Sequence, residues 1–464
     1  MVLKTHSVKE ELTRTEIVEL VNQHNGRLPR LLKLKDMYEN RNGIKGRLQS
    51  DDSKPNNKIS HPYADYIVNS IVGYFMGKPV TYSFNDNQEI TALFDDIYKY
   101  NDESAENTQL ATDASIYGVS CELMYLDKEL NPRFKAISPL EAIAIYDTSV
   151  EENLIGFIRH WKIKDVDNKD VDYVEYYNSY KVVKFTTNDN SVYEEQEHFW
   201  GDVPVVVVEN NKDLCSDFEK VVDLIDALDK VVSDTANDFE MFTNAILVVT
   251  GMDLEEEDYE KLKTTRVMNI KDVSGKAAYL FKDLPDAALE NYKNRLVDDI
   301  HKFSSVPNMS DENFANNLSG VSMQFKLSSL EFKCATKESY FRKALLRRIE
   351  LICNALSLLG KLTIKTDEII KSVDIRFTRN TINNNDELAT RALQLSTILS
   401  KETLLENLLP FIPSVEEELE RLAKEKEEKL NSIKDFDLDD QGHFVNSAKA
   451  LEGVEDEQDE ETEE

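Results

Sequence analysis

Cysteine is scarce in this sequence, and its spacing fits neither a disulfide framework nor a metal site. Four cysteines occur among 464 residues, and no two form a C-x-x-C pair. A disulfide-rich secreted domain needs many cysteines, and a structural zinc site needs closely paired ones. We therefore expect reduced thiols that fill the core of a protein made in a reducing cytosol. They are Cys121, Cys215, Cys334 and Cys353.

Long hydrophobic runs are also absent. The most apolar stretch near the N-terminus, residues 67–76, is interrupted by Asn69 and Gly73 and is too short to cross a bilayer. Charged side chains between Lys4 and Glu11 leave no apolar segment for a signal peptide. We expect neither a membrane-spanning segment nor secretion.

The sequence lacks the motifs of the common enzyme classes. The nearest match to a phosphate-binding loop, residues 73–79, is one residue short between its glycines and has Pro79 where a Ser or Thr must bind magnesium. We interpret it as a helix end that packs on a strand. The seven histidines are scattered singly, without H-E-x-x-H, and no G-x-S-x-G is present. We predict a protein that is not an enzyme and has no metal or cofactor.

Basic residues are too few for a protein that grips DNA. The chain has 55 Lys and Arg against 88 Asp and Glu, for a formal charge of -33. Tight binding of phosphates needs clustered cations that displace counterions, and an acidic surface repels a polyanion. The same repulsion suits a conduit, because DNA must pass through it without sticking.

Hydrophobic periodicity predicts a mixed α+β fold with mostly antiparallel strands. Residues 14–40 and 65–76 have helical patterns, with a break at Pro29, and residues 80–84 alternate like a strand. A helix at 108–116 precedes a series of short strands separated by turns. These strands are expected at residues 120–126, 133–137, 142–146, 155–163, 173–178, 181–186 and 198–208.

Two helical patterns flank a compact insert in the middle of the chain. The capping box from Ser216 to Glu219 predicts the start of a helix over residues 216–245. Residues 246–285 contain an acidic helical pattern and short strands, and are too few to fold alone. Residues 286–306 are again helical. The apolar faces expected to be buried are Ile225, Leu228, Val232, Phe239, Phe242 and Ile246 in the first helix and Leu289, Tyr292, Leu296, Ile300 and Phe303 in the second.

An Asn-rich segment, residues 307–320, separates the second of these helices from a much longer one at 321–360. At about 1.5 Å per residue the long helix would extend roughly 60 Å, so we interpret it as a strut beside a mobile loop. Its basic residues leave two interpretations open: a solvated face or salt bridges to neighbouring acidic helices, which is the commoner case, or a basic belt that faces a duplex. They are Lys326, Lys333, Lys337, Arg342, Lys343, Arg347 and Arg348.

The C-terminal part reads as a short strand at 373–378, helices at 387–400, 404–409 and 415–431, and then an acidic segment. Residues 455–464 contain no basic residue at all. Such a segment cannot bury enough apolar surface to offset the entropy of ordering, so we expect disorder from residue 432 onward.

Several short strings in this order resemble the portal protein family of tailed double-stranded DNA phages, in the form found in siphophages of Gram-positive hosts. The resemblance extends from about residue 14 to about residue 431. The strings are PNNKI (55–59), HPYA (61–64), GYFMGKPV (73–80), IYG (116–118) and ISP (137–139).

The resemblance implies a homo-oligomeric ring, usually a dodecamer, at one capsid vertex of the virion, with double-stranded DNA passing along its axis. Implied partners are the terminase large subunit, head completion or connector proteins, and the major capsid and scaffolding proteins. By similarity the parts are a wing (1–215 and 361–385), two stem helices (216–245 and 286–306), a clip (246–285), a tunnel loop (307–320), a long helix (321–360), a helical crown (386–431) and an acidic tail (432–464).

The resemblance also implies two functional surfaces. Residues of the tunnel loop would face DNA, and residues of the clip would contact terminase and connector proteins. The loop set is Asn313, Phe314, Asn316, Asn317 and Ser319, and the clip set is Glu255, Glu256, Glu257, Arg266 and Lys276.

Two alternatives remain at this stage. One is another head–tail adaptor or minor capsid protein, which would differ by lacking a surface that binds terminase. The other is a nuclease or ATPase of the packaging machinery, against which the missing nucleotide-binding motif speaks.

Overall fold

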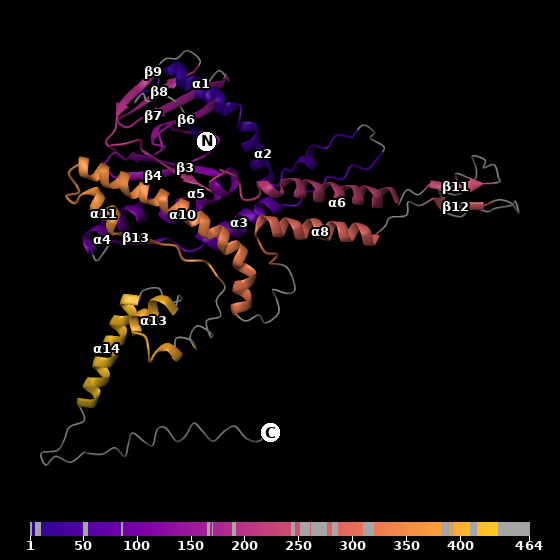
Figure 1. Cartoon of the computed structure of the whole chain (residues 1–464). Helices are drawn as coiled ribbons and strands as arrows, with labels where there is room; N and C mark the ends of the chain where they lie inside the picture. The colour runs from indigo at the N-terminus through magenta and orange to yellow at the C-terminus, as the bar shows by residue number, and fades with distance from the viewer. Residues whose placement is uncertain are drawn as a thin grey trace, which may run out of the picture. The chain divides into compact units, whose positions relative to one another are not determined.

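The computed structural model shows a mixed fold of helices and mostly antiparallel sheets, which confirms the α+β prediction (Figure 1). The chain divides into two compact units, residues 1–381 and 382–464. The structure describes residues 2–4, 11–49, 54–84, 87–164, 168, 170–187, 192–242, 246–250, 260, 276–280, 286–309, 320–381, 390, 393–408 and 415–434.

Helices α1 to α5 lie between β1 and the other strands of the two larger sheets. The expected break at Pro29 is confirmed, because this residue lies in the first turn of α2, where a proline costs no hydrogen bond. Residues 73–79 are the end of α3 and the turn after it, as interpreted from the sequence. Helix α4 was not predicted, although Asn87 caps it and its buried residues recur every four positions. The helices are α1 (Arg14–Asn25), α2 (Leu28–Tyr38), α3 (Tyr63–Met76), α4 (Gln88–Tyr100) and α5 (Glu103–Tyr117).

A six-stranded sheet has the order β1-β5-β6-β7-β8-β9. Strands β5 to β8 form the expected antiparallel meander, and β9, which was not predicted, extends it, whereas β1 adds to β5 in parallel. Helix α1 packs on this sheet through Ile17 and Val21. The strands are β1 (Val2–Lys4), β5 (Ala142–Tyr146), β6 (Leu154–Lys164), β7 (Asp170–Tyr177), β8 (Lys181–Thr186) and β9 (Val192–Glu197).

A three-stranded sheet, β10-β3-β4, lies against α5. Its strands are β3 (Val119–Leu126), β4 (Pro132–Ile137) and β10 (Val205–Glu209). Gly118 makes the turn from α5 into β3 at φ +88, and a Cβ there would lie 2.0 Å from the Leu214 carbonyl oxygen. The turn therefore requires glycine.

The strand predicted at 198–208 is right only at its end, because residues 205–208 belong to β10 and residues 198–204 do not form a strand. Residues 198–204 instead connect β9 to β10 through a bend, in which Gly201 has φ +70.

Strand β13 (Val373–Arg376) returns to the N-terminal part of the chain and pairs antiparallel with β2 (Thr81–Phe84), with Ile375 opposite Tyr82. The strand predicted near 373–378 is therefore present. Helix α11 (Thr366–Ser372), which was not predicted, leads into it.

Helix α6 (Val222–Phe242) and helix α8 (Asp286–Ser304) lie side by side, and the antiparallel strands β11 (Ile246–Thr250) and β12 (Lys276–Leu280) lie at their far ends (Figure 1).

Both hydrogen bonds of the capping box predicted at Ser216 are present. Glu219 accepts from the Ser216 amide at 3.0 Å, and the Ser216 hydroxyl accepts from the Phe218 amide while it donates to the Ser115 carbonyl. A 3-10 turn follows, so α6 begins only at Val222.

Helix α10 (Gly320–Leu358) confirms the long helix, with 39 residues, although its ribbon bends rather than running straight (Figure 1). Cys334 and Cys353 in this helix and Cys121 in β3 are buried free thiols, as expected. Cys215 is only partly buried.

The second unit contains α13 (Lys401–Leu408) and α14 (Val415–Lys434), close to the predicted helices at 404–409 and 415–431. The helix predicted at 387–400 is wrong at its end, because residues 396–399 form turns and bends. The tail predicted to be disordered from residue 432 is also wrong at its start, since residues 432–434 continue α14. The rest of that tail lies outside the described residues.

Candidate functional site

The hairpin of α6 and α8 is anchored in the core at one end only. Ile225 of α6 and Ile300 of α8 are completely buried. Farther from the core the same apolar stripes continue, yet Phe239 is 57% exposed and Tyr292 is 48% exposed. The prediction that these two side chains are buried is therefore wrong for the isolated chain, because its own core ends before it reaches them. The same prediction is wrong for Phe303, which is 55% exposed although Ile300, one turn earlier, is buried.

The basic residues of α10 mostly bind acidic groups of the same chain. Arg348 is fully buried and makes a double hydrogen bond to Glu122, at 2.7 and 2.8 Å. It also donates to Asn107 and lies 4.5 Å from the ring centre of Phe134. Burial alone would lower the pKa of Arg348, but the Glu122 and Glu103 carboxylates outweigh it and raise the pKa.

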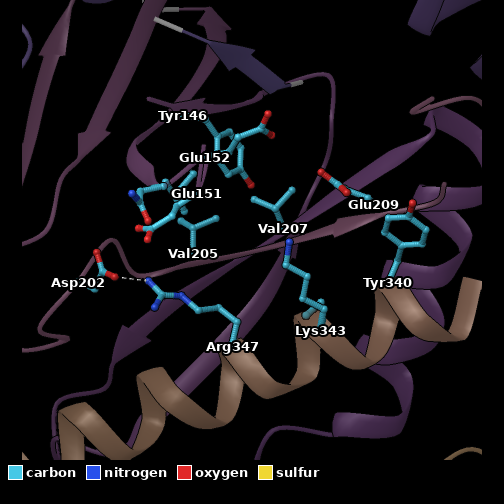
Figure 2. A pocket seen from close by; sticks show the side chains of 13 residues that line it. Tyr146, Glu151, Glu152, Asp202, Val205, Val207, Glu209, Tyr340, Lys343 and Arg347 are labelled. Atoms are coloured by element: carbon cyan, nitrogen blue, oxygen red, sulfur yellow. Dashed lines mark hydrogen bonds and ion pairs between the residues drawn. The ribbon is translucent and has the colours of Figure 1, made fainter. Parts of the chain in front are cut away.

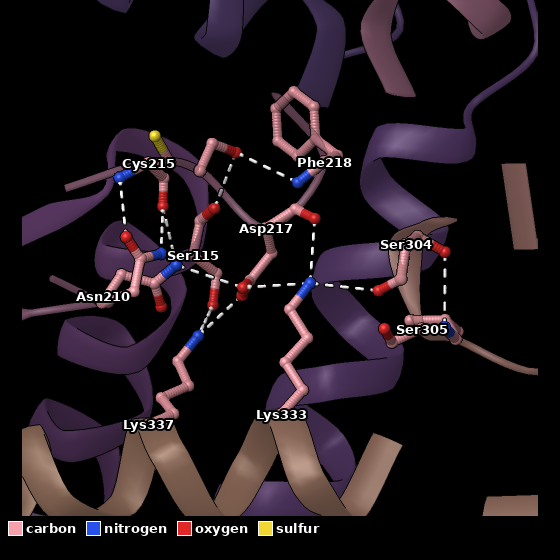
Figure 3. Close-up of polar contacts among 12 residues, drawn as sticks. Ser115, Asn210, Cys215, Asp217, Phe218, Ser304, Ser305, Lys333 and Lys337 are labelled. Carbon is pink, nitrogen blue, oxygen red and sulfur yellow. Dashed lines mark hydrogen bonds and ion pairs between the residues drawn. The ribbon is translucent and has the colours of Figure 1, made fainter. Parts of the chain in front are cut away.

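A second buried ionic cluster joins α10 to both helices of the hairpin (Figure 3). Lys337 donates to the Asp217 carboxylate at 2.7 Å, just before α6. Lys333 donates to the Asp217 carbonyl at 2.9 Å and to the Ser304 carbonyl at 3.1 Å, at the end of α8. Because the two lysines are one turn apart on α10, a single helix face holds the ends of α6 and α8 together.

Arg342 and Arg347 also form ion pairs, with Glu338 and Asp202 respectively. Five of the seven basic residues of α10 therefore bind acidic groups of their own chain. For these five, the interpretation as ion pairs within the chain is confirmed.

Lys343 differs, because it has no ion pair or hydrogen bond among the described residues. Its side chain extends into a pocket of about 460 Å³ (Figure 2). Glu151, Glu152 and Glu209 also line this pocket, so it carries more negative than positive charge and does not suit a polyanion.

The segment after α8 is fixed where it leaves the helix. The Tyr66 hydroxyl donates to the Pro307 carbonyl at 3.0 Å and accepts from the Met309 amide at 3.2 Å. The His301 ring packs edge-on against Tyr66, and its Nδ1 donates to the Val306 carbonyl at 3.0 Å. The first residues of the Asn-rich segment therefore have a defined path.

Most of the predicted functional residues fall outside the residues that the structure describes. The loop residues Asn313, Phe314, Asn316, Asn317 and Ser319 lie outside the described part of the chain, as do Glu255, Glu256, Glu257 and Arg266 of the insert. Lys276 is described and begins β12, opposite Thr250.

Sequence reasoning did not find Asp217, Tyr66 or His301. Asp217 lies inside the recognised capping box, and Tyr66 follows the HPYA string, but neither pattern reveals a partner far away in the sequence.

Two further findings limit the chemistry. Among the described residues, no group of three or more His, Cys, Asp or Glu side chains is placed to hold a metal ion. Within the same residues, no helix is both long enough and apolar enough to cross a membrane.

Comparison with known proteins gives consistent matches over nearly the whole sequence. The family described as "Phage portal protein, SPP1 Gp6-like" matches residues 18–432. The portal protein of Bacillus phage SPP1 is 25% identical over 472 residues, covering 94% of this chain and 91% of that protein. The portal protein of Clostridium phage phiCD119 is 25% identical over 452 residues, covering 90% of this chain and 98% of that protein.

Proposed function

We propose that this chain forms a ring-shaped channel for double-stranded DNA, because it belongs to the SPP1 Gp6-like family of phage portal proteins. It is a structural component of the virion and takes part in DNA packaging. In the proposed assembly, identical subunits, twelve by similarity, close a ring at one capsid vertex. DNA enters the capsid through this ring and leaves through it on ejection.

The observation that carries the proposal of a ring is the hairpin of α6 and α8. Its apolar stripes continue beyond the core, with Phe239 and Tyr292 about half exposed. Apolar side chains that continue a buried stripe into solvent mark a surface that another protein covers. Neighbouring copies of the same hairpin supply that cover in a ring.

The charge of the hairpin favours a channel through which DNA moves over a surface that binds DNA tightly. Helix α6 carries six acidic residues and one basic residue. Five basic side chains of α10 are neutralised within the chain. A wall built from these helices attracts phosphates weakly, so a duplex can move along it.

The parts of the chain receive proposed roles on this basis. We assign α6 and α8 to the stem, residues 246–285 to the clip and residues 386–431 to the crown. Glu255, Glu256, Glu257, Arg266 and Lys276 would contact the terminase large subunit and, later, connector proteins. Asn313, Phe314, Asn316, Asn317 and Ser319 would touch DNA by reversible hydrogen bonds, since none of these five side chains is charged.

Electron microscopy of the purified full-length chain tests the ring. We expect closed rings with an axial hole, and mass measurement in solution gives the number of subunits. If only monomers or dimers appear across a wide concentration range, the proposed function is wrong.

Two variants separate the roles of the parts. Deleting residues 313–318 should leave rings intact and impair DNA packaging or retention. If rings fail to form instead, this segment is an assembly contact.

Replacing Glu255, Glu256 and Glu257 by Gln should weaken terminase binding to rings, and unchanged binding would remove these residues from the docking surface.

A further inference from the structure

Residues 42–49 and 54–61 form an arm that lies along α6 between the end of α2 and the start of α3 (Figure 1). The Asn42 amide and the His61 backbone both donate to the Asp229 carboxylate, at 2.5 and 2.8 Å. Farther along α6, the Asn57 backbone donates to the side chain of Asn237 at 2.7 Å. The arm is therefore attached to α6 at both ends of its length.

The arm covers one face of α6 only. Its partners on that face are Asp229, Ser233, Asp234, Asn237 and Glu240. At about 100° per residue these five positions fall within a sector of about 140°. Phe239 points about 150° away from the centre of that sector. The arm and the exposed aromatic ring therefore lie on different sides of the stem.

Leu48 is 95% exposed, although the residues on both sides of it are held in place. Arg47 donates to the Asp234 carboxylate at 2.6 Å and to the Asn57 carbonyl at 2.9 Å. The Gln49 side chain donates to the Lys54 carbonyl at 2.9 Å. The arm therefore presents a leucine outward on a backbone fixed by polar contacts, so its apolar surface contributes burial energy only when another protein covers it.

In a cyclic ring, each subunit contacts its two neighbours through two different faces. Rotation about the ring axis does not change the position of a residue along that axis, so residues that meet across a contact lie at similar heights. Arg47 contacts Asp234, which precedes Phe239 by five residues, or roughly 7.5 Å of helix. With α6 running along the ring axis, Leu48 and Phe239 are at similar heights on opposite sides of one subunit. This arrangement is what a contact between neighbouring copies requires.

The charges of the arm and of α6 also favour a position of the arm between two neighbouring stems. Neighbouring copies of α6 repel each other, because each has six acidic residues and one basic residue. The arm, counted over residues 42–61, has four basic and two acidic residues. Lys45 is exposed and has no acidic partner among the described residues. An arm placed between two stems therefore brings positive charge between two negative surfaces.

We propose that Leu48 of one copy packs on the stem patch, Phe239 and Tyr292, of the next copy around the ring. This inference rests on the proposed function, because it needs a ring with α6 along its axis. The arm would then act as a spacer that sets the separation of adjacent stems.

Disulfide trapping in assembled rings tests the contact. Full-length chain with Cys215→Ser, Leu48→Cys and Phe239→Cys is oxidised and analysed without reductant. We expect a ladder of covalent oligomers, because each copy is joined to the next. The matched control replaces Val150, an exposed residue far from α6 in the sequence, instead of Leu48, and should give no ladder.

A second variant covers the case in which the cysteines disturb assembly. Leu48→Asp should leave the unfolding temperature of the monomer unchanged, since Leu48 is exposed there. It should raise the concentration needed for half-assembly by about tenfold or more, since an apolar contact is lost. Val150→Asp should change neither quantity.

The outcomes separate the two proposals. Normal rings that give no ladder, or Leu48→Asp rings that assemble like wild type, would overturn the arm contact and leave the channel intact. Absence of rings from the wild-type chain would overturn the proposed function itself.

Discussion

The Asp217 carboxylate, just before α6, accepts a hydrogen bond from the Lys337 ammonium group of α10 at 2.7 Å. The two side chains are only 2% and 3% exposed. Burial alone would raise the pKa of Asp217, but Lys337 and Lys333 outweigh it and hold the pKa well below its usual value. The carboxylate therefore stabilises the fold at neutral pH, and its contribution disappears only as the pH falls below the ordinary carboxyl range.

Lys337→Met should lower the free energy of unfolding by about 3 kcal/mol or more, because it leaves a buried carboxylate with only one cation. Urea denaturation of the purified chain measures this loss. Lys343→Met is the matched control, since Lys343 is on the same helix, is exposed and has no ion pair among the described residues. The control should change stability by less than about 0.5 kcal/mol. Equal effects of the two changes would contradict the role assigned to the buried pair.

Local patterns predicted many of the elements and few of the long-range contacts. Helix α3 was predictable because its apolar residues recur with the period of a helix, and helix α10 because its sequence contains few helix-breaking residues. The partner of Lys337 lies 120 residues away in the sequence, and the partner of Arg348 lies 226 residues away. Sequence spacing carries no information about such pairs, so α10 could be recognised as basic while its function in the fold stayed open.

The errors in the predicted elements also have physical causes. The apolar residues around Gly201 read as a strand, but a backbone with φ +70 and the proline at 204 end any strand there. On α6, periodicity predicts which face is apolar and not how far the core extends, so Phe239 was assigned to the interior. The predicted clip and loop residues were assigned by resemblance, and those assignments remain predictions.

Arg348→Lys should destabilise the chain by about 2 kcal/mol. A lysine provides a point charge and cannot reproduce the planar double hydrogen bond to Glu122 together with the bond to Asn107. Thermal unfolding followed by circular dichroism measures the change. Arg376→Lys is the control, because Arg376 is 65% exposed and pairs with Asp374 at the surface. A loss that is no larger for Arg348 than for Arg376 would be evidence against this explanation.

The buried histidine pair should make the fold sensitive to acid. His24 Nδ1 lies 2.7 Å from His160 Nε2, and the pair joins α1 to β6. Burial lowers the pKa of His24 to about 3 and that of His160 to about 4, although Asp172 partly opposes the second shift. In the unfolded chain both values return to about 6.5.

The unfolded state therefore binds more protons as the pH falls from about 6.5 toward 4, and stability decreases over that window. Each histidine contributes up to about 1.4 kcal/mol per pH unit. The slope is measured from urea midpoints at about pH 7 and about pH 5. His24→Asn with His160→Asn should flatten it. An unchanged slope in the double variant would assign the acid sensitivity to other groups.

Tyr66→Phe should loosen the path of the chain just after α8. The change removes the hydroxyl that donates to the Pro307 carbonyl and accepts from the Met309 amide. Losing a hydrogen bond of about 1 kcal/mol should speed hydrogen exchange at the Met309 amide by roughly fivefold or more. Mass spectrometry of peptides that contain Met309 measures this rate.

Tyr63→Phe is the matched control for that experiment. Tyr63 also packs edge-on against His301, but its hydroxyl has no hydrogen-bond partner among the described residues. Exchange at Met309 should stay at the wild-type rate in this control. If residues 307–320 contact DNA as proposed, Tyr66→Phe rings should assemble normally and retain packaged DNA less well, whereas Tyr63→Phe rings retain it. Equal exchange rates in the two variants would show that the Tyr66 hydroxyl does not position this segment.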